Sequence, residues 1–461
     1  MRRLLLGVAL GSSLTAAACG LGPTDPDRAT PTPRGSIGWA PCGDELACAT
    51  LPVPIDHTDP DGPTVDLALA VRPAARTEDR LGVLLTNPGG PGASGIDTLR
   101  SGLPLAADVL DRYDVVSWDP RGSGQSGDLD CGADLDSFLG LDPLADAADR
   151  AELDRLAPVV AQACRRGSGD LTAHLATDDQ VEDMEAVRAA TGEDTISYLG
   201  FSYGTRLGLE YLGRHGPHVT TMVLDSIVRP DLRLAELLPA QAQVFQRFAE
   251  DLLHHHESTF TTVRREAAAG RVDGIDGPLD PVRVDRALVL AGYDSARPER
   301  FLEALTEAAQ GDGRALDEQG RRYEEQVDFP AYLATNCADG AGPAGEAGWD
   351  DLERQVGRIA PLVGAVVVNE LRPCAFWPSA GRAVPPSVPA GTDATVLLLN
   401  NTGDPATPVA WARSVADALP SAMLVEVDAD GHITLDGSDC SRELAGRILT
   451  GEGRPDDPGC P

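Results

Sequence analysis

The segment Thr195–Gly216, TISYLGFSYGTRLGLEYLGRHG, places a serine between an apolar run and a helix-like run. Apart from Ser197, the residues before GFSYG are β-branched, aromatic or apolar, as in a buried strand. The run from Tyr203 has helical character, and Gly216 ends it. GFSYG is a G-x-S-x-G match, and a sharp strand-to-helix turn there exposes a serine hydroxyl. The segment predicts that Ser202 is a nucleophile; the alternative is an ordinary strand–helix turn.

Runs with strand character and runs with helix character alternate on both sides of this segment. The predicted strands lie within residues 65–74, 81–87, 113–118, 221–228, 394–401 and 422–429. The predicted helices lie within residues 177–191, 409–419 and 441–451. Thr177 is placed to cap the first of these helices, and Gly192 follows its end. The alternation predicts an α/β fold with a mostly parallel sheet and helices on both faces.

Residues 231–335 have a different pattern, with helix-like runs and no clear strand. We interpret this segment as a helical cap inserted into the α/β core. The core then has two parts, residues 39–230 and residues 336–461.

The N-terminus has the pattern of an export signal. Residues 1–18 combine two early arginines, a short apolar run and small residues, and the run is too short to span a membrane. TAAAC resembles a bacterial lipobox, although Ala16 stands where leucine is usual. We expect lipidation of Cys19, with ordinary cleavage as the alternative. Residues 19–38 are rich in proline, threonine and glycine and are expected to form a flexible tether.

The composition argues against nucleic-acid binding. The formal net charge is −34, and the chain contains no lysine. Such a chain repels phosphate backbones.

The chain has nine cysteines, and setting Cys19 aside leaves an even number that suits disulfides in an oxidising compartment. Their clustering suggests the pairs Cys42–Cys48, Cys131–Cys164, Cys337–Cys374 and Cys440–Cys460. The sequence alone does not determine the connectivity. No close C-x-x-C pair has a histidine nearby, so we expect no metal site.

A nucleophilic serine needs a histidine to take its proton and an acid to orient that histidine. In the order serine, acid, histidine, only His432 lies in a loop directly after a predicted strand; the other histidines precede Ser202, end the next helix or fall in the insertion. Asp404 ends the preceding predicted strand. Asp428 and Asp430 are alternative acids, more typical of a solvated turn.

The glycine-rich loop NPGGPG follows an early predicted strand. It matches neither nucleotide-binding glycine motif, and a Walker loop also needs a lysine. Its amides are candidates for stabilising an oxyanion, together with the N–H of Tyr203. The alternative is a structural glycine turn.

Two further groups of residues have two interpretations each. Asp119 and Arg121 in WDPRGSGQS either bind substrate or brace the loop; we favour bracing. Thr407 either bonds near Asp404 or caps the helix that begins at Pro408; we favour capping.

NPGGPG, WDPRGSGQS, GFSYGT, GDPATP and DGHI occur in the order seen in proline-iminopeptidase-like serine peptidases. The chain most closely resembles the secreted bacterial tripeptidyl aminopeptidases over Pro41 to the C-terminus. The resemblance implies an α/β-hydrolase fold with a helical cap and a catalytic set of Ser202, Asp404 and His432. It also implies Gly90 and Tyr203 as oxyanion donors, with Gly89 as the alternative to Gly90.

Two positions depart from the related iminopeptidases. Pro88 stands where a histidine is usual, and Ile433 stands where glycine often follows the catalytic histidine. Both departures lie in motifs of the expected site and therefore bear on the substrate preference.

These patterns predict a serine exopeptidase that releases short peptides, tripeptides by the resemblance, from free N-termini through an acyl-enzyme. A carboxylesterase or lipase with the same triad is the nearest alternative, and a binding protein on a decayed hydrolase scaffold is a more distant one. We expect no cofactor and no metal. The expected location is the outer face of the bacterial cytoplasmic membrane through a lipid anchor, or otherwise the medium.

Overall fold

The structure is a computed structural model that describes residues 35–127, 129–141, 147–293, 297–340, 342–343, 345–377, 387–453 and 459–460. Residues 1–18, Cys19 and the tether up to residue 34 lie outside the described residues. No helix in the ranges given is long and apolar enough to cross a membrane.

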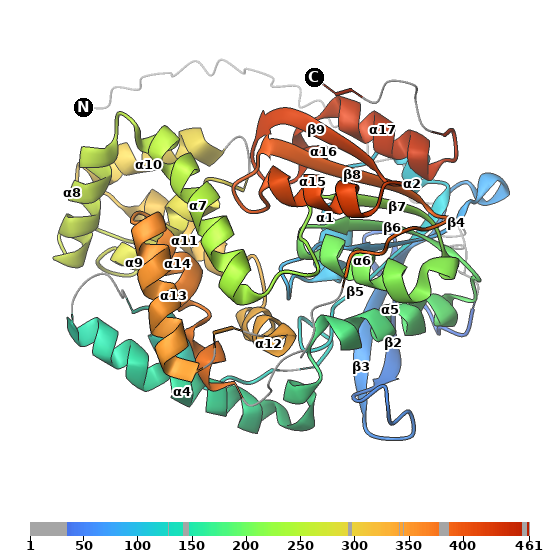
Figure 1. Ribbon diagram of the computed structural model, residues 1–461, viewed down its shortest axis with the longest axis horizontal. Helices are drawn as coiled ribbons and strands as arrows, with labels where there is room; N and C mark the ends of the chain where they lie inside the picture. The colour runs from blue at the N-terminus through green and yellow to red at the C-terminus, as the bar shows by residue number, and fades with distance from the viewer. Residues whose placement is uncertain are drawn as a thin grey trace, which may run out of the picture.

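One sheet of nine strands forms the centre of the core (Figure 1), in the order β1-β2-β3-β5-β4-β6-β7-β8-β9. β1, β2 and β3 pair in an antiparallel manner, as do β3 and β5, and every later pair is parallel. The strands are β1 Ala40–Gly43, β2 Leu46–Pro54, β3 Thr64–Arg72, β4 Gly82–Asn87, β5 Tyr113–Trp118, β6 Ile196–Phe201, β7 Val219–Asp225, β8 Thr395–Gly403 and β9 Met423–Asp430.

The central strands are rich in apolar residues because both of their faces are covered. Every residue of β5 and β6 is buried, as expected for parallel strands between two layers of helices. Leu84 and Leu199 face one core cluster, and their neighbours Leu85 and Tyr198 face the other. The predicted mostly parallel sheet with helices on both faces is confirmed.

The two layers of helices can be assigned from these clusters. α5 Thr177–Thr191, α6 Tyr203–His215 and α15 Val409–Ala418 contribute to one cluster. α1 Gly95–Ser101, α2 Ala107–Leu110 and α17 Asp439–Leu449 contribute to the other. The remaining elements of this part are η1 Thr77–Asp79, α3 Asp134–Leu139, α4 Ala147–Ser168, η2 Gly169–Ala173, η3 Gly216–His218 and α16 Thr434–Gly437.

The segment between β7 and β8 is helical, and we call it the cap. Its elements are α7 Leu234–Leu253, α8 Glu257–Ala268, α9 Pro281–Leu290, α10 Arg297–Ala308, α11 Arg314–Glu324, α12 Phe329–Asp339, α13 Gly345–Ile359, α14 Gly364–Asn369 and η4 Arg372–Phe376. The expected end at residue 335 falls inside α12. The helices continue because Trp349, Leu352 and Val356 form one apolar face of α13, which packs against α7.

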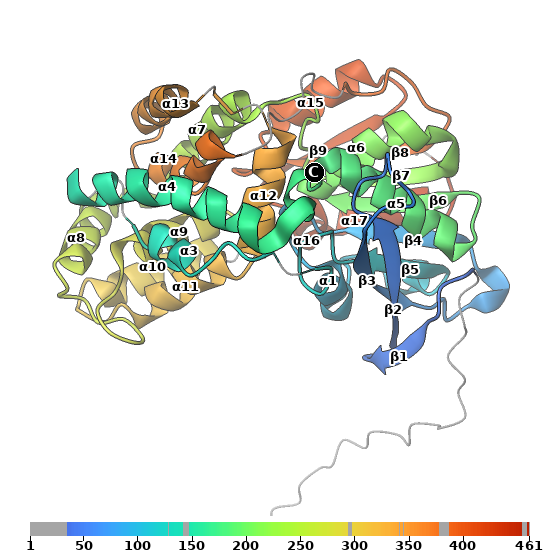
Figure 2. The same ribbon diagram turned by 90° about the horizontal axis from the view of Figure 1, so that it is seen from below.

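α4 precedes the cap in the sequence but lies along the cap helices, as Figure 2 shows. The buried Arg372 of η4 joins Asp154 of α4 to Asp350 and Glu353 of α13. The helical part of the molecule therefore includes α4, which the sequence pattern placed in the α/β core.

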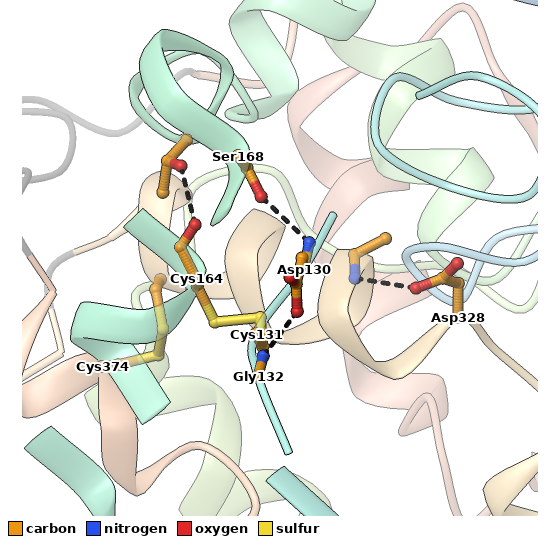
Figure 3. Close-up of a disulfide and its surroundings, with 10 residues drawn as sticks. Asp130, Cys131, Gly132, Cys164, Ser168, Asp328 and Cys374 are labelled. Carbon is orange, nitrogen blue, oxygen red and sulfur yellow. Dashed lines mark hydrogen bonds between the residues drawn. A yellow bond between two sulfur atoms is a disulfide. The ribbon is translucent and has the colours of Figure 1, made fainter. Parts of the chain in front are cut away.

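The structure contains the four disulfides suggested by the clustering of the cysteines. Figure 3 shows Cys131–Cys164, which ties the loop around Asp130 to α4. Ser168 Oγ accepts a hydrogen bond from the Asp130 amide beside it. The other three join β1 to β2, α12 to η4, and α17 to the C-terminal residues.

Candidate active site

Ser202 lies at a sharp turn between β6 and α6. Its backbone has φ 52° and ψ −123°, a conformation that is costly for a residue other than glycine. A Cβ on Gly200 would lie 2.6 Å from the Gly204 carbonyl oxygen, and one on Gly204 would lie 2.5 Å from the Asn87 carbonyl oxygen. The two glycines of G-x-S-x-G are therefore sterically required here.

His432 and Asp404 meet at the carboxyl edge of the sheet, after β9 and β8 respectively. His432 Nδ1 lies 2.9 Å and 3.1 Å from the two Asp404 carboxylate oxygens. Asp404 is fully buried and also accepts hydrogen bonds from the amides of Ala406 and Thr407. This arrangement fixes the carboxylate and presents it to the imidazole.

The other nitrogen of His432 is available for chemistry. Among the described residues, His432 Nε2 is buried and has no hydrogen-bond partner. His432 lines the same cavity as Ser202. Burial lowers the pKa of the imidazole, but the Asp404 carboxylate raises it through its charge and hydrogen bond. The pKa of His432 is therefore above its ordinary value, with a smaller contribution from the charge of Asp225.

Asp428 and Asp430 are exposed residues at the end of β9. Asp428 accepts a hydrogen bond from Thr402 Oγ1 rather than from His432. The imidazole pairs with Asp404, so these two alternatives to the acid do not fit the geometry.

Thr407 corrects an expectation, because it does not cap the following helix. The N-cap of α15 is Pro408, and no side chain caps it. Thr407 Oγ1 instead donates to Asp404 Oδ2 at 2.6 Å. A buried carboxylate accepts a charge-assisted hydrogen bond, which is stronger than the neutral bond that Thr407 would make at the helix terminus. Thr407 therefore bonds Asp404 and does not cap α15.

The position of Thr177 differs from expectation in the same way. The N-cap of α5 is Ala176, without a side-chain bond. The Thr177 hydroxyl instead bonds the Tyr203 hydroxyl at 2.6 Å and donates to Asp339 of α12. Gly192 ends α5 in the left-handed conformation, as expected.

Asp225 and Ser226, at the end of β7, hold the histidine loop and were missed by the sequence reasoning. Asp225 accepts hydrogen bonds from the amides of Thr434 and Leu435 at 2.9 Å and 2.8 Å. Ser226 Oγ accepts from the amide of Ile433 at 3.0 Å. The available signal was an acidic residue within the otherwise mostly apolar predicted strand 221–228, which in the structure ends at Asp225.

Ile433, noted above as a departure, has a φ of 71°. A β-branched residue rarely adopts this conformation, which explains why glycine suits the position. The bond from its amide to Ser226 holds the loop in this conformation.

The NPGGPG loop packs against the serine turn. A Cβ on Gly89 would lie 2.5 Å from the Phe201 carbonyl oxygen and 3.0 Å from the Tyr203 nitrogen. The Gly89 amide already donates to Asn87 Oδ1 at 2.9 Å. In the described part of the chain the Gly90 and Tyr203 amides have no such partner, and Gly90 lines the cavity with Ser202. The geometry favours Gly90 over Gly89 as an oxyanion donor.

Arg121 has the expected bracing role. It is buried and donates to both oxygens of Asp183 at 2.6 Å and 2.7 Å. It also donates to the carbonyl oxygens of Pro54, Ile55 and His174. Asp119 accepts from Ser94 Oγ and the Ile96 amide, which fixes the start of α1.

The cavity at Ser202 has a volume of about 350 Å³, within the range of ligand pockets. Its core side carries Ser202, Gly90 and His432, and its cap side carries Arg286, Tyr293, Tyr323, Tyr332 and Glu370. The Tyr293 ring meets the His432 ring edge-on, with centroids 5.4 Å apart. The cap therefore closes over the candidate catalytic residues.

Glu185, His215 and His218 lie close enough together to hold a metal ion. They are at the opposite end of α6 from Ser202. Both oxygens of Glu185 already accept hydrogen bonds from Arg188, and one also accepts from Tyr211. The carboxylate is engaged in protein contacts, so we assign no metal to this group.

The order of strands, the serine turn and the pair at the carboxyl edge define a hydrolase with the α/β-hydrolase fold. Residues 360–460 match the family described as TAP-like protein. Carboxylesterase B of Mycobacterium tuberculosis is 32% identical over 490 residues, with 95% of this chain and 93% of the relative covered. The chain belongs to the tripeptidyl-aminopeptidase-like family of α/β-hydrolases.

Two further relatives are peptidases by name. Tripeptidyl aminopeptidase of Streptomyces lividans is 29% identical over 454 residues, with 87% of this chain and 81% of the relative covered. Serine protease Hip1 of Mycobacterium tuberculosis is 28% identical over 470 residues, with 91% and 89% covered. The relatives thus include both peptidases and an esterase.

Proposed function

We propose that this protein is a serine exopeptidase that releases short peptides, namely tripeptides, from free N-termini. Ser202 is the nucleophile, His432 the general base and Asp404 the acid that orients it. The Gly90 and Tyr203 amides form the oxyanion hole. The buried His432–Asp404 pair and the two amides without partners support these roles.

In the proposed reaction, Ser202 Oγ attacks the peptide carbonyl while its proton passes to His432 Nε2. The two amides stabilise the oxyanion of the tetrahedral intermediate. His432 then gives the proton to the leaving amine as the C–N bond breaks. Water, activated by the same imidazole, cleaves the acyl-enzyme and releases the N-terminal fragment.

A buried carboxylate on the cap side of the cavity supports the preference for free N-termini. Glu370, directly after α14, is 6% exposed and lines the same cavity as Ser202. Tyr323 donates to Glu370 Oε2 at 3.1 Å. Glu370 Oε1 has no hydrogen-bond partner among the described residues, although Arg286 Nε lies 3.4 Å away. An ammonium group would satisfy this oxygen, because a charge-assisted bond suits a buried acceptor.

The pKa of Glu370 is raised because burial disfavours its charged form; the charge of Arg286 and the bond from Tyr323 offset part of this effect. A bound ammonium stabilises the carboxylate. Substrate binding therefore weakens as pH falls through this raised pKa.

Paired peptides with a free or an acetylated N-terminus test the proposal, with products identified by mass. Hydrolysis of only the free peptides, three residues from the N-terminus, is expected. Glu370→Gln should raise KM for the free peptide about tenfold or more, which is the effect of losing about 1.4 kcal/mol of a charged hydrogen bond. Glu325→Gln is the matched control, since Glu325 is exposed and outside the cavity. Equal hydrolysis of acetylated peptides would contradict the proposal.

A carboxylesterase with the same catalytic residues is the second candidate, favoured by the identity to carboxylesterase B. An ester needs less protonation of its leaving group than an amide does. Turnover of simple esters without any peptide product would favour this candidate.

We also propose the expected domain boundaries with one extension, a cap from residue 231 to Phe376. For the location we propose export and anchoring through a lipid on Cys19. The mass of the mature N-terminus in membranes tests this: an acylated Cys19 is expected, and an unmodified N-terminus would contradict it.

A further inference from the structure

A second hollow, here called the acidic groove, also reaches His432. Its volume is about 1020 Å³. The cap contributes residues of α7 and the start of α10, and the core contributes the ends of β8 and β9 with α16 and the start of α17. In Figure 1, α7 and α10 lie on the cap side and β8, β9 and α16 on the sheet side.

The groove and the cavity share the catalytic histidine. His432 and Ile433 line both hollows, whereas Ser202 and Glu370 line only the cavity. In the proposed reaction the acylated fragment stays at Ser202, with its N-terminus at Glu370. The leaving amine takes its proton from His432. The segment after the scissile bond therefore leaves on the side of the groove.

The charge of the groove is strongly negative. Six acidic side chains and one basic side chain, Arg247, line it. The acidic residues are all exposed: Asp251, Glu299, Asp428, Asp430, Asp436 and Asp439. Asp439 pairs with Arg442, but no arginine of the described chain pairs with Asp251, Glu299, Asp428 or Asp430. A cation in the groove would reduce this repulsion between like charges.

Two buried polar atoms of the groove lining also lack a partner among the described residues. Asn401 is 4% exposed; its Nδ2 donates to the Gly431 carbonyl oxygen, and its Oδ1 has no donor. His432 is 6% exposed, and its Nε2 is without a partner. Asn401 Oδ1 can accept from a peptide N–H, so the lining offers one acceptor to an extended chain beside the carboxylates, while His432 Nε2 takes part in the proton transfer.

We propose that the acidic groove binds the first residues after the scissile bond and selects a lysine or arginine side chain there. This inference rests on the proposed exopeptidase function and names its preferred substrates. These are peptides in which a basic residue follows the N-terminal tripeptide.

Isomeric peptides test the selection without a difference in total charge. Two peptides share their first three residues. The leaving segment is Lys-Ala-Ala-Glu in one and Glu-Ala-Ala-Lys in the other. The Lys-first peptide should have kcat/KM about fivefold higher or more at low ionic strength, and the ratio should fall at high salt. A ratio of one would overturn the inference.

Variants test whether the preference for the Lys-first peptide arises in the acidic groove. The double variant Asp251→Asn/Asp428→Asn changes one carboxylate on each side of the groove and should bring the ratio toward one. Glu78→Gln changes an exposed acid outside the groove and should leave the ratio unchanged. A double variant with the wild-type ratio would overturn the inference.

A tripeptide aminomethylcoumarin, whose leaving group carries no charge, distinguishes a failure of the groove inference from a failure of the proposed exopeptidase function. If this substrate and both peptides are hydrolysed, and the two peptides have equal kcat/KM, only the inference about the groove is overturned. No hydrolysis of any of the three overturns the exopeptidase function and the groove with it.

Discussion

Asp225 links the proposed nucleophile, Ser202, to the proposed base, His432, at the scale of single residues. Its carbonyl oxygen accepts the Ser202 amide at 2.9 Å, and its carboxylate accepts two amides of the histidine loop. Burial raises the pKa of Asp225 to about 6, and the bonds from Leu435 and Thr434 offset part of the rise. One side chain therefore positions the loop that carries His432 and contributes charge next to it.

Replacing this carboxylate should change the pH dependence of hydrolysis. His432 must be neutral to accept the serine proton, so kcat/KM rises as pH increases through its pKa, which the Asp404 carboxylate holds above the ordinary value of a histidine. Asp225→Asn removes a charge that raises this pKa and should move the acid limb to lower pH. It should also lower kcat about tenfold, because Thr434 and Leu435 donate to different carboxylate oxygens, and the amide replaces one of these acceptors with an NH2 donor.

The measurement is kcat/KM from pH 4 to pH 9 in both forms. Asp417→Asn, an exposed change on α15, is the control and should leave the limb in place. An acid limb that stays in place, or that moves to higher pH, in Asp225→Asn would contradict the role given to Asp225.

The meeting of the candidate residues could be predicted because each follows a strand that is readable in the sequence. Asp404 and His432 follow the last two strands, and parallel strands bring such ends to one edge. The role favoured for Thr407 was wrong and Asp225 was missed, because both residues make buried carboxylate contacts. Such contacts join residues up to 210 positions apart, as the bond from Leu435 to Asp225 does.

At the scale of elements, the cap helices are held by contacts between residues far apart in the chain, which the local sequence pattern does not reveal. The sequence placed the end of the cap at residue 335, and the structure continues it through α13, α14 and η4. Helical periodicity is a local signal, but whether a helix packs on the cap or on the sheet is set by distant partners. α4 is the clearest case, since Arg372 reaches it across 218 positions.

The Cys337–Cys374 disulfide ties α12 to η4, across 37 positions. Removing it with Cys337→Ser/Cys374→Ser should cost about 2–4 kcal/mol, because the unfolded chain gains the entropy of an open loop. Denaturant unfolding measures the loss. KM should also rise, since Tyr332 and Glu370, near the two cysteines in sequence, line the cavity.

Cys42→Ser/Cys48→Ser is the matched control, because that disulfide spans only 6 positions at the edge of the sheet. It should cost less free energy and leave KM unchanged. An unfolding midpoint in Cys337→Ser/Cys374→Ser equal to that of the wild type would show that this disulfide does not stabilise the cap.

At the scale of the whole molecule, one sheet brings Ser202, Asp404 and His432 to its carboxyl edge, and the cap divides the space above them. The smaller cavity contains the buried carboxylate of Glu370, and the larger acidic groove contains six exposed carboxylates. His432 lines both, so in the proposed reaction the leaving amine would pass from one to the other. The division fits the proposed exopeptidase, in which the N-terminal fragment and the leaving segment occupy separate spaces.

The most direct test of the central claim is labelling by a fluorophosphonate probe together with peptide hydrolysis, in the wild type and in Ser202→Ala. The wild type should gain one adduct, located by mass on the peptide that contains Ser202, and should lose hydrolysis in proportion to labelling. Ser202→Ala should take no adduct and release no tripeptide. An adduct on another residue, or hydrolysis that persists in Ser202→Ala, would contradict the assignment of Ser202 as the nucleophile.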